Sequence, residues 1–289
     1  MSTADSPTSA SSGADVPSGW HVWSRADTGP VLETTLAGPL SGVTGKVWVW
    51  LPPEYYQPQY AHSSFPVLVM QTGNTGVGEN FWDLPHVEPT QQVDVQMTGE
   101  HQAHPFIMVM PVLQMSTTQD TECSDIPGEP SMGTWLGQDV LNRVKADFRT
   151  LPAPDGWGIV GASAGAFCAV KLALQRPQDY RAVVAWCGYF EPEPDAGVRW
   201  TPAQMSANSP TRMLQDSHPD LRILLLAGDK PQFRSDQTRM AAFAQLAAPP
   251  TQITTYLQPG GGHFTADLSK LLPRIFEFLT ANLPGPSPS

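Results

Sequence analysis

Seven short apolar segments recur along this chain, and each has the length of a β-strand. In residues 46–51 the side chains of Val47 and Val49 alternate with those of Trp48 and Trp50, as in a strand that is packed on both faces. Residues 65–70 and 106–110 are continuous apolar runs, as in the buried strands of parallel sheets, and four further segments continue the series. These six segments are residues 65–70, 106–110, 157–160, 182–186, 222–227 and 253–257.

Helical patterns separate these segments. Apolar residues recur every four positions over residues 136–148 and less regularly over 240–246. Residues 166–175, rich in small and apolar residues, predict a further helix, and residues 267–282 predict an amphipathic closing helix. Strand and helix therefore alternate. Such alternation predicts a mostly parallel central sheet with helices on both faces, a three-layer sandwich.

The 289 residues are enough for one large α/β domain and few for two. Residues 1–18 are rich in Ser, Ala, Pro and Gly and read as a disordered leader without the features of a signal peptide. Residues 284–289 read as a flexible tail. We therefore expect a single domain over residues 19–283.

The net charge of −11 argues against binding to nucleic acid, which requires clustered Lys and Arg. The apolar runs are strand-sized and far below the roughly 20 residues that span a bilayer. We expect neither a nucleic-acid partner nor a transmembrane segment.

Ser163 lies in the sequence Gly161-Ala162-Ser163-Ala164-Gly165, between the predicted strand 157–160 and the predicted helix 166–175. A serine on a sharp strand-to-helix turn exposes its hydroxyl, and small neighbours let strand and helix pass close together. We predict that Ser163 is a nucleophile; the alternative is a small-residue start of a packed helix.

A serine hydroxyl needs a base within hydrogen-bonding reach. His263 follows three glycines in a loop between the last strand and the closing helix, which predicts that it is this base rather than a surface histidine. His101 and His104 have the spacing of a metal pair, but no acidic residue lies between them, and we expect neither a metal nor another cofactor.

The third member of such a triad is a carboxylate that orients the imidazole. Asp229 directly follows the strand 222–227, which favours it, and Asp236 lies one short loop further on as the alternative acid. For the aspartate that is not part of the triad, the alternative role is to cap a helix.

Acyl transfer also needs two N–H groups directed at the developing oxyanion. We assign one to Ala164, after the nucleophile, and the other to Asn74 in the turn after the strand 65–70, where Thr72 and Gly73 shape the backbone. Phe81 and Trp82 follow this turn and are our candidates for substrate binding, with ordinary packing as the equal alternative.

These residues resemble the esterase family of α/β hydrolases that includes esterase D, the enterochelin esterases and the mycolyltransferases. The resemblance covers about residues 45–282 and rests on PVLVMQTG, PFIMVMP, DTECSD before TWLGQDV, GASAGAFCAVKLALQRPQDY, and GGGHF before LPRIFEFL. Two features depart from it: Thr72 stands where relatives have His or Asp, and the acid loop AGDKPQFRSD has two aspartates.

The resemblance implies an α/β-hydrolase fold and a serine-dependent carboxylic ester hydrolase that forms an acyl-enzyme and acts on a small-molecule or glycan ester. Two alternatives stay open: an acyltransferase that moves the acyl group to a sugar or other alcohol, and a non-catalytic binding domain. Because many bacterial relatives are exported, it also implies a secreted or extracytoplasmic location, with a cytoplasmic one open. A disulfide between Cys123 and Cys168 would then leave Cys187 as a buried free thiol.

Overall fold

The computed structural model describes residues 16–26, 28–74, 76–83, 90–195 and 197–287. Most of the proposed leader therefore lies outside the described residues. Within the described ranges, nine strands form one sheet in the order β1-β2-β3-β5-β4-β6-β7-β8-β9. Their bounds are β1 His21–Ala26, β2 Gly29–Ala37, β3 Thr44–Trp50, β4 Val67–Gln71, β5 Ile107–Pro111, β6 Trp157–Ala162, β7 Ala182–Trp186, β8 Arg222–Gly228 and β9 Gln252–Gln258.

The sheet is antiparallel from β1 through β3 to β5 and parallel from β5 to β9. All seven predicted strands are confirmed, with ends that differ by at most two residues. β1 and β2 were not predicted. Both are polar at several positions, and β2 carries Glu33, Thr34 and Thr35 in its middle.

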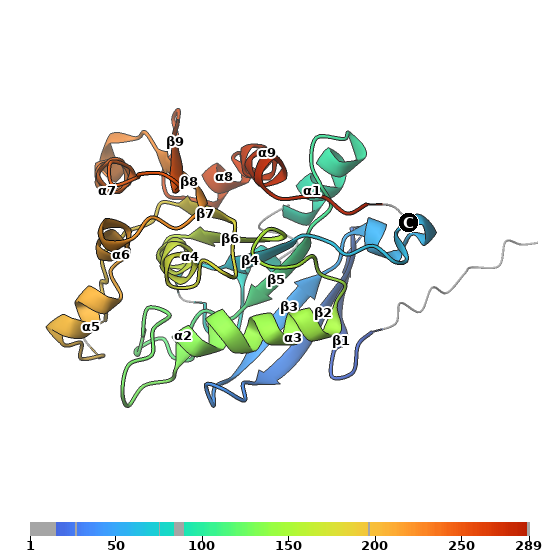
Figure 1. The fold of residues 1–289 in the computed structure, drawn as a ribbon, viewed down its shortest axis with the longest axis horizontal. Helices are drawn as coiled ribbons and strands as arrows, with labels where there is room; N and C mark the ends of the chain where they lie inside the picture. The colour runs from blue at the N-terminus through green and yellow to red at the C-terminus, as the bar shows by residue number, and fades with distance from the viewer. Residues whose placement is uncertain (1–15, 27, 75, 84–89, 196, 288–289) are drawn as a thin grey trace, which may run out of the picture.

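Helices cover both faces of the sheet, which confirms the three-layer α/β fold (Figure 1). In this view α8, α9 and α1 lie on one side of the sheet, and α3 and α4 lie on the other. The longer helices are α1 Thr90–Gly99, α3 Val140–Asp147, α4 Ala164–Gln175, α7 Arg234–Ala244 and α9 Leu272–Asn282. The shorter ones are η1 Pro53–Tyr56, η2 Pro58–Tyr60, η3 Phe81–Asp83, α2 Met132–Thr134, η4 Trp135–Asp139, α5 Pro202–Ala207, α6 Pro210–Asp216, η5 Pro231–Phe233 and α8 Thr265–Ser269.

The predicted closing helix is two helices. α8 ends at Ser269 and α9 begins at Leu272, with Pro273 in its first turn, where the missing N–H of proline does not interrupt hydrogen bonding. The break turns the chain after the His263 loop before α9 packs on the sheet through Leu272, Ile275, Phe276 and Leu279.

The parallel strands form the centre of the hydrophobic core. Every residue of β4, β5, β6 and β7 is buried. No helix among the described residues has the length and apolar character needed to cross a bilayer. Because parallel strands end at the same edge of a sheet, the loops after β4, β6, β7, β8 and β9 gather there, and this edge holds the candidate site.

Candidate active site

Ser163 occupies the turn between β6 and α4. Its backbone has φ of 56° and ψ of −120°, a conformation that costs free energy for a residue with a side chain and that is typical of a nucleophile at such a turn. A Cβ on Gly161 would collide with the backbone of Gly165, and a Cβ on Gly165 would collide with the carbonyl of Thr72. The small neighbours of Ser163 therefore permit this turn.

The loop after β4 lies against Ser163. A Cβ added to Gly73 would be 3.6 Å from the Cβ of Ser163 and 3.4 Å from the carbonyl oxygen of Ala162. Thr72 accepts a hydrogen bond at its hydroxyl from the backbone N–H of Phe81 (3.4 Å), and the side-chain oxygen of Asn74 accepts one from Gln114 (3.1 Å). The turn that the sequence assigns to the oxyanion is thus adjacent to Ser163, and the Asn74 side chain is engaged with Gln114.

His263 lies in the loop between β9 and α8. Its Nδ1 is 3.1 Å from Oδ2 of Asp236, and its ring makes an edge contact with Trp186, with 5.1 Å between the ring centroids. Trp186 ends β7 and accepts a hydrogen bond at its carbonyl from the backbone N–H of Ser163 (2.9 Å). Trp186 therefore contacts both residues that the sequence pairs as nucleophile and base.

The carboxylate beside His263 is Asp236, the alternative acid, which differs from our preference for Asp229. Asp236 lies in the first turn of α7 and is 8% exposed. Asp229 is exposed, and its Oδ1 accepts a hydrogen bond from the backbone N–H of Gly260 (2.7 Å). The short helix η5 turns the chain after Asp229, so that α7 brings Asp236 to His263 while Asp229 holds the base of the glycine loop.

A second carboxylate supports the His263 loop. Asp267 accepts a hydrogen bond from the backbone N–H of Gly262 (2.9 Å) and lies near the ammonium groups of Lys230 and Lys270, and these contacts hold its pKa below the ordinary value against the effect of desolvation. Asp267 was not a candidate in the sequence. Its position four residues after His263 is the one sequence signal by which it could have been found.

The thiol of Cys187 also lies at this edge. The sulfur of Cys187, a carboxylate oxygen of Asp236 and a ring nitrogen of His263 all lie within 4.8 Å of one another. Cys187 directly follows β7 and has φ of 52°. Burial, and then the charge of Asp236, raise the pKa of this thiol to about 12. Cys187 is therefore a protonated neighbour of the Asp236 and His263 pair, as expected for a buried free thiol.

The two aromatic candidates for substrate binding have different environments. Phe81 is partly exposed, and its ring would be 3.7 Å from a Cβ on Gly73, so it flanks the loop beside Ser163. Trp82 is 1% exposed and donates from Nε1 to the carbonyl of Gln71 (3.1 Å). A substrate therefore has no access to Trp82, whose contacts are those of a residue that anchors the loop.

Two aromatic side chains that the sequence analysis did not select flank His263. Phe264 is 55% exposed and meets the ring of Phe233 edge-on at 5.6 Å, and Phe233 lies 6.2 Å from the His263 ring. Their positions beside the histidine make this rim apolar. Phe233 is far from His263 in sequence, and only the fold of η5 brings it there.

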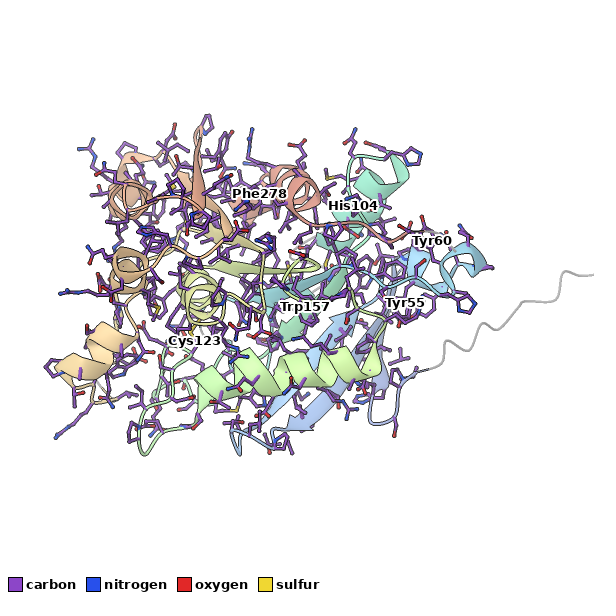
Figure 2. The ribbon with its side chains drawn as sticks, in the orientation of Figure 1. Tyr55, Tyr60, His104, Cys123, Trp157 and Phe278 are labelled. Carbon is purple, nitrogen blue, oxygen red and sulfur yellow. A yellow bond between two sulfur atoms is a disulfide. The ribbon has the colours of Figure 1, made fainter. Side chains whose placement is uncertain are left out.

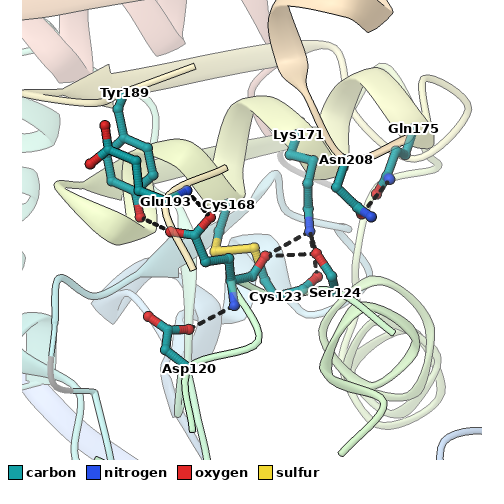
Figure 3. The surroundings of a disulfide bond; sticks show 10 residues. Asp120, Cys123, Ser124, Cys168, Lys171, Gln175, Tyr189, Glu193 and Asn208 are labelled. Atoms are coloured by element: carbon teal, nitrogen blue, oxygen red, sulfur yellow. Dashed lines mark hydrogen bonds between the residues drawn. A yellow bond between two sulfur atoms is a disulfide. The ribbon is translucent and has the colours of Figure 1, made fainter. Parts of the chain in front are cut away.

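The disulfide between Cys123 and Cys168 is present, as the family resemblance implied, and it joins the loop after β5 to the helix that begins after Ser163. Beside it the ammonium of Lys171, fully buried, donates to the carbonyls of Glu122 (2.7 Å) and Cys123 (2.8 Å) (Figure 3). Burial lowers the pKa of Lys171 to about 7.

The carboxylate of Glu122 extends the same cluster to the loop after β7. It accepts hydrogen bonds from the hydroxyl of Tyr189 (2.6 Å) and the backbone N–H of Glu193 (2.8 Å), and desolvation raises its pKa to about 7. Tyr189 and Glu193 line a pocket of about 440 Å³ whose opposite wall is α7, the helix that carries Asp236. The disulfide and Glu122 thus hold one wall of this pocket.

Comparison with known proteins identifies one family. Residues 42–266 match the family described as "Putative esterase". The chain is 25% identical over 171 residues to an uncharacterized protein of Corynebacterium glutamicum, over 57% of this chain and 39% of that protein. It is 27% identical over 150 residues to an esterase of Mycobacterium tuberculosis, over 44% of this chain and 33% of that protein. The matches thus span well under half the length of these relatives.

Solved structures share the fold. A ferulic acid esterase superposes with a TM-score of 0.71 at 19% identity, over 88% of this chain and 98% of the other. An S-formylglutathione hydrolase from Agrobacterium tumefaciens superposes with the same TM-score at 14% identity, over 90% and 98% of the two chains.

Proposed function

The chain belongs to the Putative esterase family, and from that membership we propose that it is a serine esterase that hydrolyses carboxylic esters of small molecules. Ser163 is the nucleophile, His263 the general base and Asp236 the acid that orients it. The observation that carries this assignment is the 3.1 Å contact between His263 and Asp236 at the sheet edge where Ser163 adopts its strained turn.

The reaction has two halves that use the same groups. The Ser163 oxygen attacks the ester carbonyl carbon as His263 takes the hydroxyl proton, and the charge of Asp236 stabilises the imidazolium that forms. The tetrahedral intermediate collapses, the alcohol leaves with the proton from His263, and an acyl-enzyme results. Water then attacks the acyl-enzyme as His263 takes a proton from it, and the carboxylic acid leaves as His263 returns that proton to the Ser163 oxygen.

The oxyanion is stabilised by the backbone N–H groups of Ala164 and Asn74. Ala164 begins α4, where the first N–H groups of a helix have no partner within it. The contact of Gly73 with Ser163 supports Asn74 as the second donor, since it brings this loop beside the nucleophile. Phe81 and the rim of Phe233 and Phe264 are proposed to contact the apolar part of the ester.

An extracytoplasmic location is part of the proposal. The bond between Cys123 and Cys168 supports it, because disulfides persist mainly in oxidising compartments. Cell fractionation of the organism, with immunodetection of the protein, is the direct measurement.

A fluorophosphonate probe tests the catalytic assignment, with p-nitrophenyl esters from acetate to palmitate as substrates. We expect the wild type to be labelled and to hydrolyse at least one ester, and Ser163→Ala to do neither. Absence of labelling in the folded wild type, or equal labelling of Ser163→Ala, would contradict the proposal. Addition of a polyol acceptor to the same assay separates hydrolysis from transfer, since a transferase forms product only when the acceptor is present.

A further inference from the structure

A group of buried oxygen atoms without partners lies between α1 and η1, away from the candidate active site. Asp94, in the middle of α1, is completely buried. Within the described part of the chain neither of its carboxylate oxygens makes a hydrogen bond of ordinary geometry, and the backbone N–H of Phe106 lies near them. The hydroxyl of Thr98 is buried and without a partner in the same sense. Because Thr98 follows Asp94 by four residues, both side chains lie on one face of α1.

A second carboxylate faces this helix. Glu54 lies in η1, and its Oε2 is buried without a partner among the residues described. Desolvation, and then the charge of Glu54, raise the pKa of Asp94 well above the ordinary value, whereas the backbone N–H of Phe106 has a smaller opposing effect. The carboxyl groups of Glu54 and Asp94 therefore lie in one buried region, where an unpaired charge is strongly unfavourable.

A polar pocket of about 380 Å³ adjoins these oxygens. Glu54 and Thr98 belong to its wall, together with Gln57, Tyr60, His101 and His104. Tyr60 and His104 are labelled in Figure 2, at the end of the molecule where α1 and the short helices η1 and η2 lie. Glu54 and Thr98 thus connect the buried oxygens to this pocket.

Two kinds of partner can neutralise such a pair: one proton shared between the carboxyl groups, or a cation. A shared proton would link the two carboxyl groups but would leave the Thr98 hydroxyl unpaired. A cation can use all of these oxygens, and a set of carboxylate and hydroxyl oxygens suits a hard ion such as Ca²⁺, which accepts variable oxygen geometry. The unpaired hydroxyl therefore favours the cation.

We propose that Glu54, Asp94 and Thr98 form a binding site for a hard divalent cation of the calcium type, which ties η1 to α1. His101 and His104 line the approach to this site and are not among its ligands. The site is separate from the esterase assignment, so either can fail without the other.

The test uses the full chain after treatment with a chelator. Isothermal titration with CaCl₂ should give one binding site, and the melting temperature should rise with CaCl₂ in the range up to about 1 mM, since an ion that binds only the folded state stabilises it by mass action. Asp94→Asn and Glu54→Gln should each reduce the affinity at least tenfold and abolish the rise in melting temperature. Asp216→Asn, at an exposed acid of α6, is the matched control and should keep the wild-type response.

Two results would overturn the proposal. One is a wild type that shows neither calcium binding nor a calcium-dependent melting temperature. The other is an undiminished calcium response in Glu54→Gln and Asp94→Asn, which would put any bound ion elsewhere. A shared proton instead predicts no calcium response and an Asp94→Asn variant that melts at a higher temperature than the wild type at pH 7.

Discussion

Asp236→Asn should lower kcat/KM for a p-nitrophenyl ester by roughly 10⁴-fold without unfolding the protein. Four decades in rate correspond to about 5 kcal/mol of transition-state stabilisation. This loss has two physical sources. The asparagine carries no charge to stabilise the imidazolium of His263, and its amide favours the wrong tautomer of the ring.

The structure supports an effect of this size because water screens the pair only in part. The Asp236 side chain is 11% exposed and that of His263 29%, with 3.1 Å between Oδ2 and Nδ1. A carboxylate in this position acts on the imidazole through a largely desolvated contact, where electrostatic interactions are stronger than at a surface.

Asp229→Asn is the matched control. Asp229 is exposed and accepts one hydrogen bond, from the N–H of Gly260, which an asparagine oxygen can also accept. We expect kcat/KM to stay within about threefold of the wild type, in line with the net contribution of one hydrogen bond.

The assay is initial-rate hydrolysis over a range of ester concentrations at pH 8, with circular dichroism to verify that each variant is folded. A large loss in Asp229→Asn together with near-normal activity in Asp236→Asn would refute the argument, because it would mean that the contact with His263 does not carry the catalytic effect.

Three further predictions concern the surroundings of the site. Cys168→Ala should destabilise the folded protein by about 3–5 kcal/mol, measured by urea denaturation, because it opens the loop closed by Cys123; a stability equal to that of the wild type would contradict this. Glu122 has a folded-state pKa of about 7 against an ordinary value of 4.5, so its contribution to stability is complete below about pH 4.5 and is lost as the pH rises to about 7. Glu122→Gln should therefore flatten the fall in melting temperature over this interval, and an unchanged slope would exclude Glu122 as its cause. Phe81→Ala should raise KM for aryl esters with little change in the melting temperature, whereas Trp82→Ala should cost about 3–5 kcal/mol of stability; equal effects of both on KM would argue against the assigned roles.

Local chemistry in the sequence predicted the centre of the sheet and the turn that carries Ser163, the proposed nucleophile. β4 to β8 are buried apolar runs, and a run buried on both faces is visible without knowledge of its neighbours. The turn at Ser163 is local as well, since its glycines and alanines are needed for the chain to fold back there. β1 and β2 escaped prediction because much of their pattern is polar and their pairing with β3 is what defines them.

The contacts of the site were decided by tertiary structure. Asp229 and Asp236 are seven residues apart in one connection, and the sequence favoured the one nearer the strand. The packing of α7 against β8 and β9 brings Asp236 to His263 and leaves Asp229 to the glycine loop. Trp82 likewise follows the oxyanion turn in the sequence, and only the folded structure shows that its side chain is buried. The amino-acid sequence by itself determined which residues have the chemistry of a nucleophile, base and acid, because those are properties of side chains and short turns. Which acid meets the base depended on the docking of whole helices, which no local pattern encodes.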